Sequence, residues 1–151
     1  MENINQDKER LPAELQENIR HIVQYQNRIR NVQRQTPEDF LTIFNLQADM
    51  LVFIGRVSTY CETVAEEKKL MRETVYWETY QNSPKQKEMN ANLAALPYKK
   101  EEIEWNGMAR RWKTALRTIE HQMNALKYKH KDKEKVREED RYHWEAHRQS
   151  R

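Results

Sequence analysis

Residues 105–126 read WNGMARRWKTALRTIEHQMNAL, and this stretch decides the fold. Its apolar side chains recur every three or four positions: Trp105, Met108, Trp112, Ala115, Ile119, Met123 and Leu126. A hydrophobic repeat of this period keeps one stripe of a helix facing a second helix along its whole length. The stretch therefore predicts a long helix that packs against a partner helix.

A second long helix is predicted upstream, over residues 36–81. Thr36-Pro37-Glu38-Asp39 is typical of a helix start, because threonine caps backbone N–H groups, proline suits the first turn and acids favour the positive end of the helix dipole. Asn82-Ser83-Pro84 is expected to end this helix. Its own apolar residues again recur at intervals of seven: Met50, Val57, Val64 and Met71.

The segment between the two repeats, residues 82–98, predicts a reversal of the chain. We expect a short helix over residues 85–95, a break at Leu96-Pro97 and a new helix from Tyr98 to at least Leu126. The predicted fold is all-α: a long antiparallel, coiled-coil-like helical hairpin over residues 36–128. Gly55 lies inside the first long helix, and a close helix crossing there would explain why it is tolerated.

The flanks of this hairpin differ from it in composition. Residues 1–10 are polar and expected to be disordered, and residues 11–35 carry the pattern of an amphipathic helix from about 12 to 34. Residues 129–151 form a charged C-terminal extension, expected to be partly helical with a frayed end. A two-helix hairpin exposes some of its apolar side chains to solvent. We therefore expect the N-terminal helix, or other subunits of a homo-oligomer, to bury them. These side chains are Phe40, Phe44, Phe53, Tyr60 and Tyr80.

Composition narrows the class of protein. The 151 residues include two glycines and 37% hydrophobic residues, which favours elongated helices over a thick globular core. The single cysteine, Cys61, lies among apolar neighbours and predicts a buried thiol in a reducing compartment. We find no signal-peptide pattern and no apolar run of about 18 residues that would predict a membrane span. The expected location is the cytoplasm.

The sequence favours a non-enzymatic protein without a metal or cofactor. Two glycines cannot form a glycine-rich phosphate loop, and Cys61 lacks the neighbouring histidine and acid of a nucleophile. His143 and His147 have a spacing that metal sites use, but Glu145 is not in the position of the zincin general base and no third ligand follows. We interpret them as exposed histidines.

Basic residues alternate with aromatic residues near both predicted helix ends. Lys68, Lys69 and Arg72 precede Tyr76, Trp77 and Tyr80, whereas Lys99 and Lys100 follow Tyr98, and Arg110, Arg111 and Lys113 surround Trp112. An antiparallel hairpin would bring these stretches to one pole, where cations bind phosphates and rings stack on unpaired bases. This pattern suits single-stranded nucleic acid, since no groove-reading motif is present. The alternative is that the charges form solvated helix faces, because glutamates are interspersed among them.

The layout of residues 46–128 resembles the small all-α recombination mediators of tailed phages, the UvsY-like family. The resemblance consists of the paired lysines Lys68-Lys69 followed by Tyr76-Trp77-Tyr80, a polar break, and a helix that runs from Met108-Ala109-Arg110-Arg111-Trp112-Lys113 to Lys127. It implies a homo-oligomer, ring-like in form, that binds single-stranded DNA coated with a single-strand-binding protein and helps load a RecA-like recombinase. The family's basic stretch falls on Lys68, Lys69 and Arg72.

Two other functions remain open from the sequence. The heptad repeats alone suit a structural or scaffolding coiled-coil phage protein with no nucleic-acid role. A small regulator that binds a partner protein through an exposed helical face is the third possibility.

Overall fold

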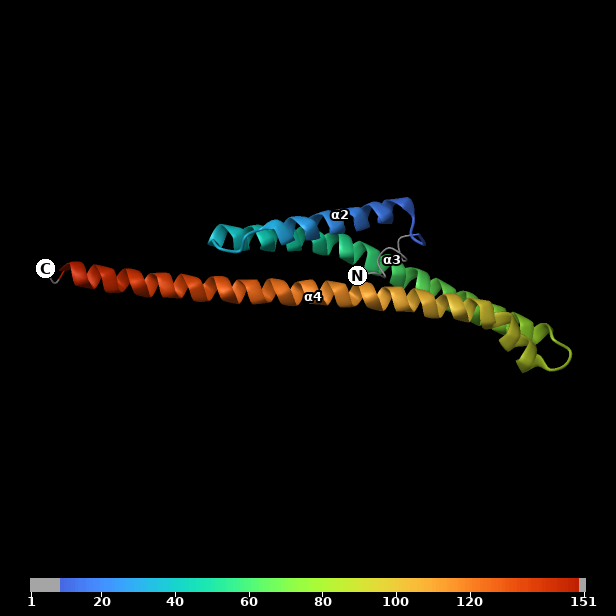
Figure 1. The fold of residues 1–151 in the computed structure, drawn as a ribbon. Helices are drawn as coiled ribbons and strands as arrows, with labels where there is room; N and C mark the ends of the chain where they lie inside the picture. The colour runs from blue at the N-terminus through green and yellow to red at the C-terminus, as the bar shows by residue number, and fades with distance from the viewer. Residues whose placement is uncertain (1–8, 150–151) are drawn as a thin grey trace.

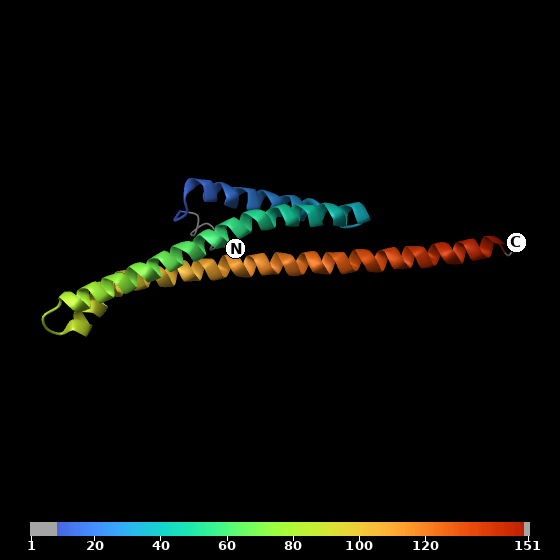
Figure 2. The same cartoon turned by 180° about the vertical axis from the view of Figure 1, so that it is seen from behind.

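The computed structural model describes residues 9–149, with the side chains of residues 130, 133–134, 136–137, 139–140 and 142–149 left aside. Regular structure in this range consists of α2 (Ala13–Asn31), α3 (Pro37–Asn82) and α4 (Lys87–Gln149). Figures 1 and 2 show α3 and α4 as a long hairpin, with α2 lying along the first half of α3. The predicted all-α fold is confirmed.

The N-terminus of α3 is held by reciprocal hydrogen bonds. The backbone N–H of Asp39 donates to Thr36 Oγ1 at 3.2 Å, while Asp39 Oδ2 accepts from the N–H groups of Gln35 and Thr36, each at 2.9 Å. This capping box satisfies backbone donors that have no partner inside the helix. The backbone hydrogen bonds from Thr36 and Gln35 favour the carboxylate and lower the pKa of Asp39. The helix start predicted at Thr36 is confirmed.

The connection between the long helices is shorter than the sequence predicts. α3 ends at Asn82 as expected, but α4 begins at Lys87 and continues through Pro97, so the predicted break and the separate helix over residues 85–95 are wrong. A proline inside a helix costs about 3 kcal/mol, because it removes one hydrogen bond and crowds the preceding turn. Packing before and after Pro97 offsets this cost, since Ala91, Ala95 and Met108 are all buried.

Cross-helix contacts give the register of the hairpin. Gln47 hydrogen-bonds Gln122, and further along α3 Lys68 pairs with Glu101, so the contacts move backwards along α4 as they advance along α3. The antiparallel arrangement is therefore as predicted. α4 also runs well past the first residues of α3, as Figure 1 shows. Within residues 129–151, the extension expected to be partly helical belongs to α4 as far as Gln149.

The core runs through all three helices. Ile19 and Ile22 of α2 and Met50, Ile54 and Val57 of α3 are almost fully buried, together with Cys61, Met108 and Trp112. The buried thiol predicted at Cys61 is thus confirmed. The repeat that begins at Trp105 is covered unevenly: Trp105, Ala115, Ile119, Met123 and Leu126 are only half-buried. The second half of this repeat therefore keeps one flank accessible.

α2 covers part of the apolar surface that the hairpin would expose. The Phe53 ring stacks on His21 at 4.9 Å and on Tyr25 at 6.0 Å between ring centroids, and Phe40 is buried. Tyr60 is half-buried, with its ring edge against Trp105. Among the apolar side chains that the hairpin alone was expected to expose, Tyr80 stays exposed. The most exposed apolar residues near the closed end are Leu70, Trp77, Met89, Leu93 and Ile103, and of these the sequence singled out Trp77 alone.

Gly55 has no close helix crossing to explain it. A Cβ atom built at Gly55 would lie 3.8 Å from Leu116 Cδ1, which is an ordinary van der Waals contact. The predicted reason for this glycine is therefore wrong.

By length and composition, α3 is long and apolar enough to cross a membrane, although the sequence contains no uninterrupted apolar run that predicts such a span. A core helix that is covered from two sides meets the same criteria. Here Met50, Ile54 and Val57 of α3 are buried between α2 and α4. Packing inside the bundle accounts for these three side chains, whereas Leu41 and Val52 of the same helix are exposed.

Candidate nucleic-acid interface

Three aromatic rings form a cluster near the closed end of the hairpin. Tyr76 lies edge-on to Trp77 at 5.3 Å and parallel to Tyr80 at 6.2 Å between ring centroids, and Trp77 meets Tyr80 at 5.9 Å. Lys87 Nζ lies 5.8 Å from the centre of the Tyr80 ring, a cation–π contact that joins the start of α4 to the end of α3. Trp77 is 58% exposed. One large ring of the cluster is thus accessible to a ligand.

A hollow of about 250 Å³ opens between this cluster and α4. α3 contributes Arg72, Tyr76 and Trp77, of which Tyr76 lies one turn after Arg72, and α4 contributes Asn92 and Lys99, two turns apart. The hollow is completed by Glu73, Ala95 and Leu96. The antiparallel hairpin therefore places two cations, two rings and an amide around one space, and this set could contact a flat aromatic group and an adjacent anion.

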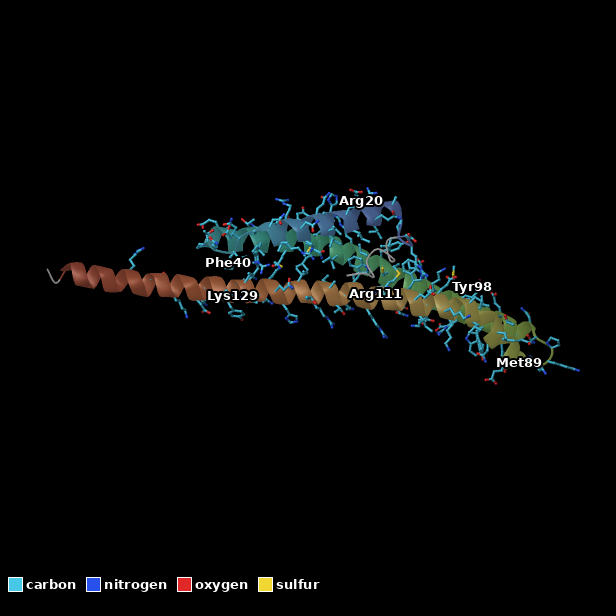
Figure 3. All side chains as sticks on the ribbon, viewed as in Figure 1. Arg20, Phe40, Met89, Tyr98, Arg111 and Lys129 are labelled. Atoms are coloured by element: carbon cyan, nitrogen blue, oxygen red, sulfur yellow. The ribbon has the colours of Figure 1, made fainter. Side chains whose placement is uncertain are left out.

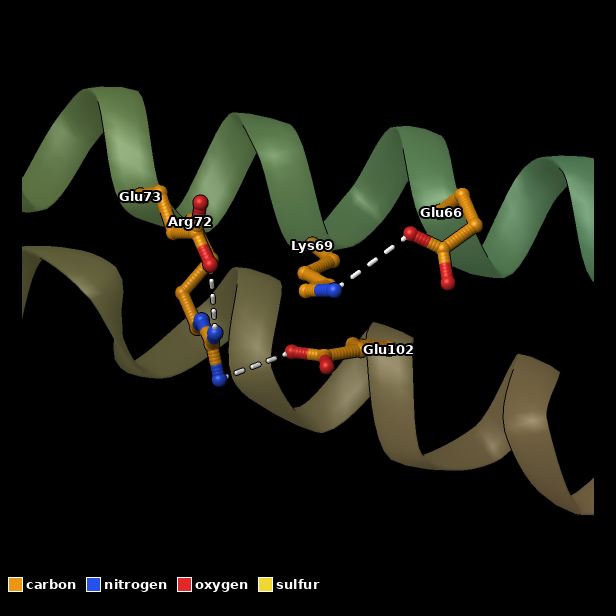
Figure 4. Close-up of polar contacts among 5 residues, drawn as sticks. All are labelled: Glu66, Lys69, Arg72, Glu73 and Glu102. Carbon is orange, nitrogen blue, oxygen red and sulfur yellow. Dashed lines mark hydrogen bonds and ion pairs between the residues drawn. The ribbon is translucent and has the colours of Figure 1, made fainter.

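Glutamates pair with the basic residues of α3 near this hollow. Lys68 Nζ lies 2.6 Å from Glu101 Oε2 on α4, and Lys69 Nζ lies 3.5 Å from Glu66 Oε2 one turn earlier on α3. Figure 4 shows Lys69 turned along its own helix toward Glu66. The two lysines of the predicted site thus already have counter-charges.

Arg72 reaches two carboxylates. Its Nη1 lies 3.0 Å from Glu102 Oε2 across the hairpin, and its Nη2 lies 3.3 Å from Glu73 Oε1 (Figure 4). Glu102 Oε2 is buried and lacks a well-directed hydrogen bond, so the contact with Arg72 is a charge contact rather than an aligned bidentate pair. Both side chains are mostly covered, at 28% and 15% exposure.

The other three predicted site residues lie further along α4. Lys113 Nζ pairs with Glu62 Oε1 at 3.1 Å, and Arg110 is exposed. Arg111 lines a separate groove between α2 and α4 and is labelled in Figure 3, away from Met89 near the closed end. The structure therefore divides the six predicted residues into an α3 group (Lys68, Lys69 and Arg72) and an α4 group (Arg110, Arg111 and Lys113).

Asn92 and Leu96 are members of the hollow that the sequence did not indicate. The sequence predicts Asn92 on a short helix over residues 85–95 and Leu96 in a break after it, which leaves both residues without predicted neighbours on α3. A continuous α4 lays residues 87–99 against the end of α3 instead. The seven-residue spacing from Asn92 to Lys99 was the signal that could have placed both on one helix face.

No group of three metal-ligating side chains gathers within the described residues. His143 and His147 have a spacing that metal sites use, but their side chains lie outside the residues whose side chains the structure describes.

Comparisons of this chain with protein-family models, with curated proteins and with solved structures found no match.

Proposed function

We propose that this protein is a non-enzymatic, homo-oligomeric single-stranded DNA-binding protein of the cytoplasm. The observation that carries the proposal is the hollow in which Arg72 and Lys99 flank the rings of Tyr76 and Trp77. The resemblance of residues 46–128 to UvsY-like proteins extends the proposal to a recombination mediator, which helps load a RecA-like recombinase on DNA coated by a single-strand-binding protein.

The chemistry of the hollow suits an unpaired base and its phosphate. Stacking on an exposed ring contributes about 1–3 kcal/mol per base and needs a base face that a duplex does not offer. Trp77 supplies such a face, and Lys99, which is exposed and makes no described ion pair, supplies a charge for the phosphate. A single strand therefore fits this site better than a duplex.

The ion pairs around Arg72 weaken each site. A phosphate must displace Glu102 or Glu73 before it gains the full charge of the guanidinium. Binding to one protomer is therefore expected to be modest and to fall steeply with salt. Several protomers that contact one strand raise the effective concentration at each site, which supplies the affinity that a single hollow lacks.

The first test is fluorescence anisotropy of a labelled oligothymidine at low and at physiological salt. Trp77→Ala is expected to weaken binding by about 5- to 150-fold, the equivalent of one lost stacking contact. The matched control is Tyr128→Ala, because Tyr128 is an even more exposed ring that lies far along α4. Absence of binding by the unaltered protein, or a larger loss with Tyr128→Ala than with Trp77→Ala, would refute the proposal.

A gain in affinity provides a second and sharper test. Glu102→Gln removes the carboxylate that holds Arg72, so affinity for the oligothymidine should rise. Glu120→Gln makes the same change in net charge at an exposed position of α4 that has no described ion pair. The gain in affinity for the oligothymidine should therefore be larger for Glu102→Gln than for Glu120→Gln. Equal gains from the two variants would show that only net charge matters.

A structural or scaffolding role is the second candidate, and one observation favours it. Met89, Leu96 and Ile103 recur at intervals of seven on α4 and are exposed, as is Leu93 between them. Such a stripe is typical of a helix that packs against another helix. This role predicts a stable oligomer with no DNA affinity. Light scattering combined with the anisotropy measurement separates the two candidates.

A further inference from the structure

The side of α4 that faces away from α2 and α3 carries a line of exposed residues. Figures 1 and 2 show α2 and α3 on the same side of α4. Met108 and Trp112 are buried on that side, and Arg110 lies about half a turn from each of them, so it points to the opposite side. Side chains that recur with Arg110 every three or four positions share its face. We call them the outer stripe, and all of them are exposed: Lys99, Ile103, Asn106, Arg110, Thr114, Arg117 and His121.

Every ionisable residue of the outer stripe is basic. The structure shows no ion pair or hydrogen bond between the side chains of Lys99, Arg110 or Arg117 and the residues that it describes. Lys68 and Arg72 on α3, in contrast, are paired with carboxylates of α4. The hairpin therefore neutralises these cations at its helix–helix contact and leaves the cations of the outer stripe available to a ligand.

Most carboxylates on the same part of α4 lie off the outer stripe and are held in ion pairs. These pairs are Glu101 with Lys68, Glu102 with Arg72 and Glu104 with Arg10. Glu120 flanks the far end of the outer stripe and has no described ion pair. The outer stripe therefore carries a local positive charge, although the formal net charge of the whole chain is only +3.

The outer stripe begins at the hollow beside Tyr76 and Trp77, the aromatic hollow, because Lys99 belongs to both. Arg110 and Arg117 follow Lys99 at about 17 Å and about 27 Å along the helix axis, at a rise of about 1.5 Å per residue. At about 3.4 Å per nucleotide, a stacked single strand would place about eight nucleotides over this length. Cations of one sign along a line suit a linear polyanion, since a compact anion would contact only one of them.

We propose that the outer stripe is the path of the single strand beyond the aromatic hollow, with backbone phosphates against Arg110 and Arg117. This inference rests on the proposed function and adds where the strand runs on the protein. A phosphate at Arg110 or Arg117 displaces no described carboxylate, whereas a phosphate at Arg72 must displace Glu102 or Glu73. The outer stripe therefore contributes most of the electrostatic part of the affinity, and the aromatic hollow contributes the stacking.

The salt dependence of oligothymidine binding measures these phosphate contacts. For a single strand, the logarithm of the affinity falls with the logarithm of the salt concentration by about 0.7 per phosphate contact. Arg110→Gln combined with Arg117→Gln should therefore lower this slope by about 1.4, so that the loss of affinity between about 50 and about 200 mM salt becomes about sevenfold smaller. The matched control is Arg28→Gln combined with Arg56→Gln, which makes the same change in net charge at exposed arginines of α2 and α3 and should leave the slope nearly unchanged.

An added cation provides the reverse test. Thr114 is exposed on the outer stripe between Arg110 and Arg117, so Thr114→Lys should steepen the slope by about 0.7 and raise the affinity at low salt. Thr59→Lys makes the same substitution at an exposed position in the middle of α3 and should have a smaller effect. Circular dichroism checks that each variant keeps the helical content of the unaltered protein.

Three results would overturn the inference. The first is an equal slope for the outer-stripe pair of variants and the control pair, and a loss of affinity with Trp77→Ala would then still support the proposed function. The second is a duplex of the same length that binds more tightly than the single strand and depends equally on Arg110 and Arg117, which would assign the outer stripe to duplex DNA. The third is absence of binding by the unaltered protein, which would refute the proposed function as well.

Discussion

Gly55→Ala is expected to stabilise the protein, although Gly55 lies at a helix–helix contact. An alanine inside a helix is favoured over glycine by about 1 kcal/mol, because it loses less backbone entropy on folding. The added methyl group meets Leu116 Cδ1 at 3.8 Å, a distance that needs no rearrangement. The expected gain in unfolding free energy is therefore about 1 kcal/mol, which raises Tm by about 2–4 °C for a chain of this size.

Thermal unfolding followed by circular dichroism measures this gain. Gly107→Ala is the matched variant, because its Cβ would meet only the flexible end of Arg111 at 3.6 Å, and it should stabilise by a similar amount. Ala125→Gly, at an exposed position of α4, measures the decrease in Tm that a glycine causes inside this helix. If Gly55→Ala lowered Tm while Gly107→Ala raised it, the two long helices would have to lie closer at Gly55 than the structure shows, and the reasoning would fail.

Three further predictions concern the helix ends and the ion pairs. The pKa of Asp39 is lowered by folding, so its contribution to stability is present above the ordinary carboxyl pKa and is lost as the pH falls through the lowered value. The difference in Tm between the unaltered protein and Asp39→Asn should accordingly shrink between about pH 7 and about pH 2.5. Gln86 has a φ of 50°, so Gln86→Gly should raise the unfolding free energy by up to about 1 kcal/mol in urea unfolding, and a decrease would contradict the argument. A double-mutant cycle of Arg72→Gln and Glu102→Gln should give a coupling free energy of about 1 kcal/mol that decreases in high salt; a coupling of zero would mean that the pair does not form in solution.

The helical architecture could be predicted because it depends on local patterns. The heptad positions from Trp105 to Leu126, the cap at Thr36 and the stop at Ser83-Pro84 each carry a signal within a few residues. Pro97 shows where such signals fail. Its local preference is to end a helix, but burial of Ala91, Ala95 and Met108 against the rest of the bundle outweighs that preference. Tertiary packing of this kind does not appear in a local pattern.

The candidate interface could be predicted only in outline. That cations and rings meet at the closed end follows from antiparallel topology, which the repeats indicate. Lys69 and Glu66 are one turn apart on α3, but the counter-charges of Lys68 and Arg72 on α4 depend on the register between the two helices. Arg72 and Glu102 are thirty residues apart in sequence, and only a register that places them side by side makes them a pair. The sequence could show that glutamates are present, but not which lysine or arginine of α3 each glutamate of α4 faces.

The length of α4 also fixes a distance scale for any assembly. A helix of 63 residues spans about 95 Å, and α4 begins beside the aromatic hollow and extends beyond the first turn of α3. A ligand held at the closed end and a partner held at the far end of α4 are therefore separated by more than the width of a typical small domain. In an oligomer that brings the closed ends of the hairpins together, the C-terminal ends of the α4 helices would therefore lie far from that contact, at the outside of the assembly.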